Sequence, residues 1–162
     1  MGNSSSKFST LVFLRKDDHV LLGLKKRGFG EGKWNGIGGK PDRDESILDA
    51  AKRELQEEIG VVAKELEHVA KLSFSFDANA DWNQTVYVFI VNSWIGQPVE
   101  TEEMHPQWFT IDSIPFDSMW EDDAYWLPPV LEGKKITGDF QFNADQKLSS
   151  HRVDETEILL LE

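Results

Sequence analysis

Cysteine is absent from this chain of 162 residues. Its absence excludes disulfide bonds and thiol catalysis, and it fits a reducing compartment such as the cytoplasm. Long hydrophobic runs are absent too. None approaches the roughly 20 residues that span a bilayer, and no hydrophobic secretion signal opens the chain, so we expect a soluble protein.

Basic residues are scarce. The chain has 17 lysines and arginines against 29 aspartates and glutamates, which gives a formal net charge of −12. Nucleic-acid polymers bind through basic surfaces, so this balance argues against such a partner. A small anionic substrate is still compatible with it, because a bound cation reverses the local field.

The chain does contain enough apolar material for one folded domain. Hydrophobic residues make up 40% of it, and six are tryptophans. A chain of this length can bury a full core, so we predict a flexible tail over residues 1–7 and a single domain over residues 8–162. The start, MGNSSSK, fits the M-G-x-x-x-[ST] myristoylation pattern through Gly2 and Ser6; a disordered polar terminus or a cloning remnant is the alternative. Membrane contact is expected only if Gly2 is acylated, and one acyl chain anchors marginally.

Apolar, β-branched stretches predict strands, and one long 3.6-residue period predicts a helix. The predicted strands are residues 8–14, 19–25, 69–76, 84–94, 108–111, 136–142 and 157–161, with a short extended stretch at 34–38. One helix is predicted to begin near residues 44–46 and to end at Gly60, and residues 117–131 are predicted to be mostly helical. Mixed strands with two helices predict an α+β fold, a helix–sheet–helix sandwich.

The segment from Gly39 to Val61, GKPDRDESILDAAKRELQEEIGV, carries the strongest functional signal. Its predicted apolar stripe consists of Leu48, Ala51, Leu55 and Ile59, with Ile47 at one edge. Beside this stripe Glu54, Glu57 and Glu58 occupy helical positions i, i+3 and i+4, so their carboxylates share a face. Three like charges together cost free energy unless a cation holds them, and oxygen ligands suit a hard ion such as Mg²⁺, which in turn binds phosphates.

Every fixed position of the pattern G-x5-E-x7-R-E-U-x-E-E-x-G-U, with U apolar, is met in this segment. The chain therefore resembles the Nudix hydrolases, which cleave nucleoside diphosphates linked to a further group. The resemblance implies the Nudix fold with a mixed sheet, and Mg²⁺ as the cofactor with Mn²⁺ as a substitute. The implied metal ligands are the carbonyl of Gly38 and the side chains of Glu54, Glu57, Glu58 and Glu103; the four glutamates are the predicted catalytic residues, with Glu103 a candidate general base. Glu45 and Arg53 are implied to pair and to brace the helix.

Two further segments, residues 25–40 and 116–128, closely resemble the animal MutT homologues, which destroy oxidised purine nucleoside triphosphates. The resemblance implies hydrolysis of 8-oxo-dGTP and 2-oxo-dATP, with O6-methyl-dGTP a further candidate, to the monophosphate and pyrophosphate, which sanitises the nucleotide pool. The implied substrate-binding residues are Thr10, Lys25, Phe29, Asn35, Ile37, Gly38, Gly39, Lys40, Phe74, Trp120, Asp122 and Asp123. We expect a monomer in the cytoplasm, with nuclear or mitochondrial pools as alternatives.

The chemistry of these side chains suits a purine. Trp120 and Phe29 can sandwich or wall the ring, because aromatic stacking on a base is worth about 1–3 kcal/mol, and Asn35 offers a donor and an acceptor. If Asp122 and Asp123 face one pocket, their titrations couple and one keeps its proton near neutral pH. Exchange of that proton would let one pocket read both oxidised guanine and oxidised adenine. The alternative interpretation of this acid pair is a helix N-terminus that favours negative charge.

Two departures from the family pattern leave the substrate ranking open. Ile37 stands where relatives have Phe, and DWNQT at residues 81–85 is longer and more polar than the Leu-Met-Asp of relatives. The other interpretations that remain open are a Nudix hydrolase of dinucleoside polyphosphates or ADP-ribose, a nucleotide-binding protein without catalysis, and a lipid-anchored interaction module.

Overall fold

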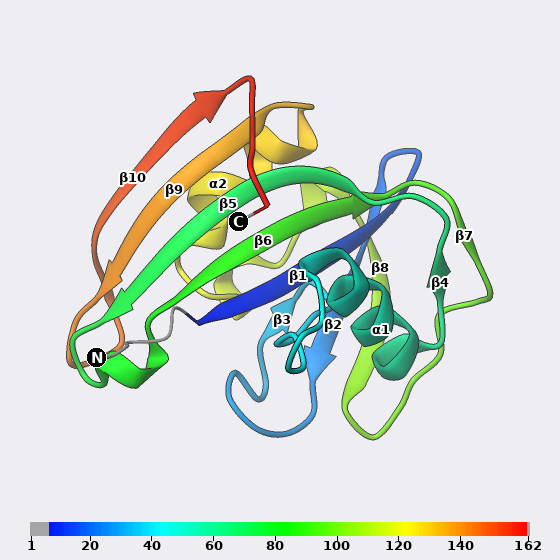
Figure 1. Ribbon diagram of the computed structural model, residues 1–162, viewed down its shortest axis with the longest axis horizontal. Coiled ribbons are helices and arrows are strands. Elements are labelled where there is room, and N and C mark those ends of the chain that lie inside the picture. The colour runs from blue at the N-terminus through cyan, green and yellow to red at the C-terminus, as the bar shows by residue number, and fades with distance from the viewer. Residues whose placement is uncertain (1–6, 162) are drawn as a thin grey trace.

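The computed structural model describes residues 7–161 of the chain (Figure 1). Its strands are β1 (Phe8–Lys16), β2 (His19–Lys25), β3 (Trp34–Asn35), β4 (Val62–Ala63), β5 (Glu67–Phe76), β6 (Gln84–Val91), β7 (Trp94–Ile95), β8 (Met104–Thr110), β9 (Lys135–Phe142) and β10 (Leu148–Thr156). Its helices are α1 (Ile47–Ile59) and α2 (Asp123–Leu131), with short 3-10 turns at Ala80–Trp82, Ile111–Ser113 and Phe116–Ser118. The myristoylation pattern at Gly2 lies outside the described residues. Within them, no helix is long and apolar enough to cross a membrane.

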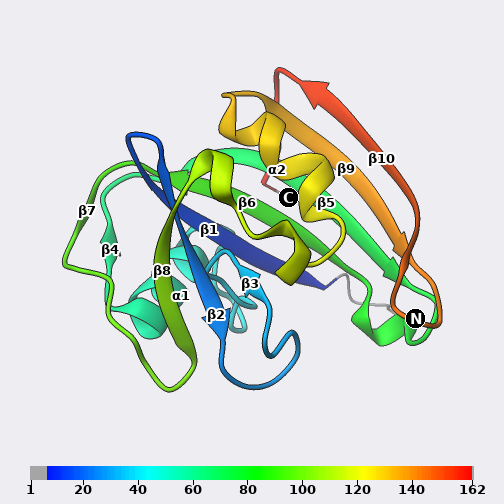
Figure 2. The ribbon, with the colours of Figure 1, turned by 180° about the vertical axis from the view of Figure 1, so that it is seen from behind.

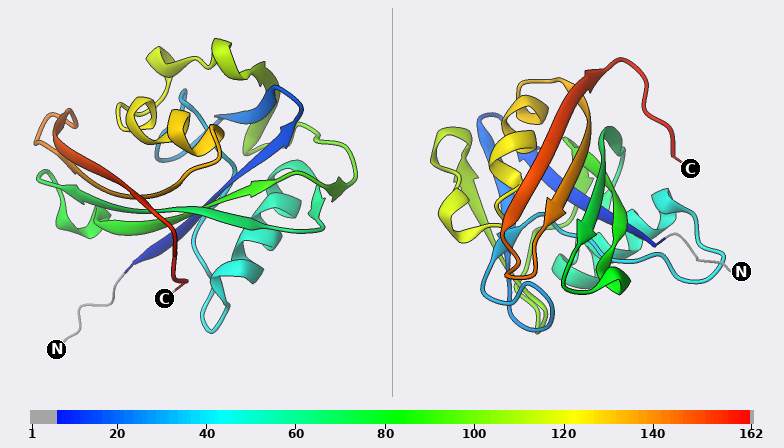
Figure 3. Two further views of the ribbon diagram at one scale, coloured as in Figure 1. Left: turned by 90° about the horizontal axis from the view of Figure 1, so that it is seen from above. Right: turned by 90° about the vertical axis from the view of Figure 1, so that its left-hand side faces the viewer.

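A mixed sheet forms the centre of the described part of the chain. Its strand order is β10-β9-β5-β6-β1-β2-β3, and β8 pairs with β2. The pairs β1–β6 and β5–β9 run parallel, and the other pairs are antiparallel. Seen from above in Figure 3, α1 lies on one face of the sheet and α2 on the other. The predicted α+β sandwich is therefore confirmed.

Both faces of the central strands are apolar, so each face carries its own core. Along β1, Val12 and Leu14 pack in the cluster that includes Leu55 of α1. The intervening Phe13 packs in the other cluster, which includes Trp126 of α2. This alternation follows from the two-residue period of a strand. Each helix is thus fixed to β1 from the opposite side.

Strands β1 and β2 separate soon after their hairpin (Figure 2). They pair only at Arg15 with Val20 and at Lys16 with His19. Farther along β1, the partner is instead the loop that follows β3. The N–H of Thr10 donates to the carbonyl of Gly39 over 2.8 Å. This divergence brings the loop before α1 against β1 and opens space beside β2.

One predicted strand is wrong, and one segment predicted to be mostly helical is interrupted. Residues 157–161 form no strand, and the last strand is β10, whose sequence LSSHRVDET is polar because it lies at the edge of the sheet with both faces largely exposed. The apolar residues that suggested a strand stand in solvent, with Ile158 74% exposed. The predicted helix over residues 117–131 shrinks to α2, because Met119 adopts extended backbone angles (φ −122°, ψ 175°) that separate α2 from the turn at Phe116–Ser118.

Candidate active site

Helix α1 forms where local signals agree. The hydroxyl of Ser46 accepts a hydrogen bond from the N–H of Asp49 over 3.1 Å and so caps the first turn. Gly60 ends the helix at φ 74°, a left-handed conformation that glycine adopts without a steric penalty. Leu55 and Ile59 are fully buried against the sheet. The two caps set the ends of α1, and the two buried side chains set the face that packs on the sheet.

The apolar stripe of α1 differs from the predicted one by one position. Leu48 is exposed, and Ile47 packs against the core instead. The face that meets the sheet is therefore rotated toward the glutamates. As a result Glu58 is only 8% exposed, which leaves its carboxylate at the boundary between the core and a cavity.

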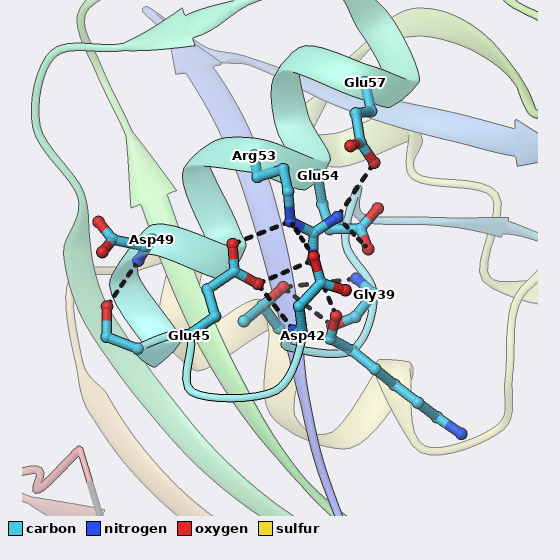
Figure 4. Close-up of polar contacts among 10 residues, drawn as sticks. Gly39, Asp42, Glu45, Asp49, Arg53, Glu54 and Glu57 are labelled. Carbon is cyan, nitrogen blue, oxygen red and sulfur yellow. Dashed lines mark hydrogen bonds and ion pairs between the residues drawn. The ribbon is translucent and has the colours of Figure 1, made fainter.

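One guanidinium joins four carboxylates on and before α1 (Figure 4). Nε of Arg53 lies 2.9 Å from Glu45 and 3.4 Å from Asp42, and Nη1 lies 3.0 Å from Glu57 and 3.4 Å from Glu54. The hydrogen bond from Arg53 holds the pKa of Glu45 below its usual range. The expected Glu45–Arg53 pair is present, and it ties the loop before α1 to the helix.

The loop before α1 packs closely against β1 at Gly38 and against the side chain of Glu54 at Gly39. A Cβ on Gly39 would lie 2.2 Å from an oxygen of Glu54, and one on Gly38 would lie 1.8 Å from the carbonyl oxygen of Thr10. The N–H of Gly38 donates to Glu58 over 3.2 Å. Burial raises the pKa of Glu54, and burial together with the charge of Glu54 raises the pKa of Glu58 to about 7. The carboxylates of Glu58, which is buried, and Glu54, which is partly buried, thus repel each other.

This donor set fits a hard divalent cation. Two crowded carboxylates gain from a shared positive charge, and oxygen ligands are those that Mg²⁺ prefers. The other two predicted carboxylate ligands bind arginines. Glu57 forms an ion pair with Arg53, and Glu103 accepts a hydrogen bond of 3.0 Å from Nε of Arg27. That hydrogen bond lowers the pKa of Glu103. Within residues 7–161, no three acidic or histidine side chains are arranged so that they could hold a metal ion together, so a bound ion would draw further carboxylates away from their arginines.

A cavity of about 190 Å³ opens beside the carboxylates of α1, where β1 and β2 diverge. Its predicted lining residues are Thr10, Lys25, Phe29, Asn35, Gly38, Gly39, Glu58, Phe74, Trp120, Asp122 and Asp123. Two residues predicted to bind substrate do not line it. Ile37 is fully buried and bonds to Val12 in the core on the α1 side, and Lys40 is exposed. Ile37 therefore acts on the cavity only through packing.

Aromatic rings form one side of the cavity. Phe29 stacks on Trp120 with ring centroids 5.2 Å apart and planes at 24°. A base between two rings needs a separation of about 7 Å, twice the van der Waals contact distance. In this conformation the two rings leave no room for a base between them, so they could only wall one. Phe29 also contacts Trp82, and Trp120 meets Phe142 edge to face.

Asp122 and Asp123 lie at the start of α2 and are almost completely buried. Oδ2 of Asp122 accepts a hydrogen bond from Nε1 of Trp126 over 2.7 Å, whereas Oδ2 of Asp123 is buried without a hydrogen-bond partner. Burial raises the pKa of Asp122 to about 6, and burial together with the charge of Asp122 raises the pKa of Asp123 well above its usual range. Near neutral pH this arrangement favours an ionised Asp122, which accepts, and a protonated Asp123, which donates. Both acids also stand at the N-terminus of α2, as the alternative interpretation expects, although Asp122 makes no side-chain capping hydrogen bond there.

The cavity contains residues that the sequence prediction missed. They are Ser9, Leu11, Gly23, Gly30, Lys33, Gly36, Leu72, Gln84, Val86, Met104, Trp126 and Phe142. For Trp126 a signal existed, because it follows Asp122 at the i+4 spacing of a helix. Most of the others come from strands distant in sequence, and only the sheet register brings them together.

Comparison with known families identifies the class. A family profile described as NUDIX domain matches residues 6–130. Together with the carboxylate helix and the sandwich fold, this match shows that the chain belongs to the Nudix family. The MutT protein from Bacillus halodurans has a similar crystal structure, with a TM-score of 0.80, 26% sequence identity, and coverage of 91% of this chain and 97% of that one.

Closer sequence relatives are animal proteins. The chain is 44% identical over 155 residues to the oxidized purine nucleoside triphosphate hydrolase of Danio rerio. The aligned region covers 96% of this chain and 99% of the relative. It is also 44% identical over 154 residues to the protein of the same name from Mus musculus. That aligned region covers 95% of this chain and 98% of the relative. The resemblance therefore extends over nearly the whole chain and is not confined to the carboxylate helix.

Proposed function

We propose that this protein hydrolyses oxidised purine nucleoside triphosphates to the monophosphate and pyrophosphate. One observation carries the proposal: a purine-sized aromatic cavity with a buried acid pair adjoins the half-buried carboxylates of α1. The near-full-length similarity to the two animal hydrolases supports the same substrate class. The reaction adds one water across a phosphoanhydride bond and releases two phosphate-bearing products.

The carboxylates of α1 are proposed to hold Mg²⁺, with Mn²⁺ as a substitute. Glu54 and Glu58 would bind it first, since they already crowd each other, and Glu57, Glu103 and the carbonyl of Gly38 would complete the ligands. Bound there, the ion would neutralise phosphate charge and lower the pKa of a coordinated water. Carboxylates of the site accept the proton of the attacking water. Arg53 holds the helix and its preceding loop in place by its ion pairs and does not react.

The base is proposed to lie against Trp120 and Phe29, with its polar edge at Asp122 and Asp123. A protonated aspartate donates a hydrogen bond and an ionised one accepts. The unpartnered oxygen of Asp123 is the group that a substrate would satisfy. A shift of the shared proton between the two acids would adapt the cavity to oxidised guanine or oxidised adenine. Asp122→Asn and Asp123→Asn should each narrow the substrate range and change its pH profile, and an unchanged ranking in both variants would contradict this hypothesis.

The decisive experiment measures pyrophosphate release from 8-oxo-dGTP, 2-oxo-dATP, O6-methyl-dGTP and ordinary dNTPs, with Mg²⁺ and with chelator. We expect a preference for oxidised purines that chelator abolishes. Glu57→Gln and Glu58→Gln should each lower activity by at least about a hundredfold. Glu65→Gln is the matched control, because Glu65 is exposed and lies outside the helix. Equal rates on all dNTPs would refute the substrate class, and activity in chelator would refute the metal.

The setting of the reaction follows from the substrate. An enzyme of this class would act on the nucleotide pool, which we expect to be that of the cytoplasm, with nuclear or mitochondrial pools as alternatives. We expect it to act as a monomer, since the residues proposed for catalysis and binding all come from one chain. Size-exclusion chromatography with light scattering tests that expectation.

A further inference from the structure

Two polar side chains lie on the sheet face that forms the floor of the cavity. Ser9 belongs to β1, and Gln84 is the first residue of the parallel strand β6. The hydroxyl of Ser9 donates a hydrogen bond to Oε1 of Gln84, and both residues line the cavity. They are 75 positions apart in sequence. Gln84 lies within the segment DWNQT that departs from the family pattern, so the departure puts an amide into the base cavity.

The bond from Ser9 fixes which end of the amide is free. Because the carbonyl oxygen of Gln84 is engaged, the NH₂ group at Nε2 is the end left to donate. No residue within 7–161 accepts a hydrogen bond from it. Its neighbours on the floor include Leu72, Phe74 and Val86, which offer no acceptor in their side chains. A donor among apolar groups gains most from an acceptor on a bound ligand.

The acid pair proposed to bind the polar edge of the base lies on another element. Asp122 and Asp123 come from α2, whereas Gln84 comes from the sheet, so a flat ring that enters the cavity meets polar groups from two elements. Oxidation of a purine at C8 or C2 replaces a C–H by a carbonyl and adds an acceptor to the rim. An amide donor on the floor can contact that acceptor, and it gains nothing from the C–H of an ordinary purine.

We propose that Gln84 is a specificity-determining residue, whose amide donates to the carbonyl that oxidation adds to the purine, and that Ser9 is the positioning residue that orients this amide. The inference rests on the proposed function and deepens it, because it assigns the discrimination of oxidised from ordinary purines in part to the floor of the cavity. The substrate class that follows is a purine triphosphate with an added keto oxygen on its rim.

The test compares kcat/KM for 8-oxo-dGTP, 2-oxo-dATP, dGTP and dATP in the wild type, Gln84→Met and Gln84→Glu. Both variants remove the donor, and glutamate keeps the size of glutamine. We expect the ratio of oxidised to ordinary kcat/KM to fall about tenfold for at least one of the two oxidised substrates, with little change for dGTP and dATP. Gln107→Met is the matched control, since Gln107 is an exposed residue of β8 outside the cavity.

Ser9 is tested through its dependence on Gln84. Ser9→Ala should lower the same ratio, by less than the loss of the amide itself, because the freed amide samples other orientations. In the double variant Ser9→Ala/Gln84→Met the ratio should equal that of Gln84→Met alone, since Ser9 then has nothing to orient. Additive losses would show that Ser9 acts independently and would overturn its positioning role.

The outcomes separate the two proposals. A wild type that prefers oxidised purines, with the preference intact in both Gln84 variants, overturns the role of Gln84 and leaves the proposed function standing. A wild type without any such preference overturns both. Thermal unfolding of each variant identifies a folding defect, and a fall in all four rates together would indicate damage to the site and count against a role in specificity.

Discussion

Nε1 of Trp126 donates a hydrogen bond of 2.7 Å to Oδ2 of Asp122 in the wall of the base cavity. The bond favours the charged carboxylate and so opposes burial, which raises the pKa of Asp122 to about 6. Trp126 therefore keeps Asp122 an acceptor at neutral pH. Any change to this indole should alter the protonation of the acid pair.

Trp126→Phe should shift the pH profile of the reaction. Without the indole donor the pKa of Asp122 rises further, so the acidic limb of the kcat/KM profile for 8-oxo-dGTP should move up by about one pH unit. Trp94→Phe serves as the control, because Trp94 stacks on Trp108 away from the cavity. An unchanged pH profile in Trp126→Phe would show that the hydrogen bond to Asp122 does not affect the reaction.

Asp123→Asn should stabilise the fold at neutral and alkaline pH. The folded-state pKa of Asp123 is raised by burial, so above its ordinary pKa of 3.8 the folded protein binds a proton that the unfolded chain has lost. Stability from this group therefore falls as the pH rises from about 4 through the raised pKa, and asparagine abolishes that fall. Thermal unfolding between pH 4 and pH 9 should show a Tm that is a few degrees higher in the variant than in the wild type, and this difference in Tm should grow as the pH rises. The exposed Asp139→Asn should show no such trend.

Gly39→Ala should abolish activity while the protein remains folded. The added Cβ would lie 2.2 Å from an oxygen of Glu54, so the carboxylate or the loop must move by more than an ångström. We expect kcat to fall by about a hundredfold or more, since misplacement of this size has that effect at catalytic sites. Gly133→Ala is the comparison away from the site: a Cβ there meets no atom within 4 Å, and the left-handed φ of +96° can cost stability but should leave kcat unchanged. Full activity in Gly39→Ala would mean that Glu54 tolerates displacement.

Arg53→Lys should destabilise the loop before α1. A lysine keeps the charge, yet it cannot contact Glu45 through a planar pair of N–H groups and reach Glu57 as well. Arg53 is partly exposed, so solvent screening limits the expected loss to about 1–2 kcal/mol of unfolding free energy, measured by denaturant titration. Arg152→Lys provides the comparison, since Arg152 is exposed and, among residues 7–161, forms an ion pair with Asp154 alone. Equal losses in the two variants would rule out a special role for Arg53.

The sequence predicted the local features well and the distant ones poorly. Helix α1 was predictable because Ser46, the 3.6-residue period and Gly60 all lie within one short segment. The meeting of Ser9 with Gln84 was not, because it depends on the parallel register between β1 and β6. Strand β10 escaped prediction for a physical reason: an edge strand with two polar faces has no apolar alternation to detect.

The position of the substrate residues was predictable mainly through family resemblance. Spacing alone placed Trp120 and Asp122 near each other but gave no reason for Phe29 to join them from a loop far earlier in the chain. Resemblance did not show that Phe29 would contact Trp120 directly, which depends on side-chain packing. It also placed Ile37 at the cavity, whereas its side chain is committed to the core behind β1.

The two faces of the sheet have consequences for how such a protein can change. The carboxylates proposed to support hydrolysis stand on the α1 side, whereas the walls proposed to contact a base come largely from α2 and the floor of the opposite face. The two regions meet at Gly38, Gly39 and Thr10; an added Cβ would strike the backbone of Thr10 at Gly38 and the carboxylate of Glu54 at Gly39. A lineage can therefore alter the floor and the walls and acquire a new nucleotide without rebuilding its chemistry. Variation should accumulate on one side of β1 while the other side stays fixed.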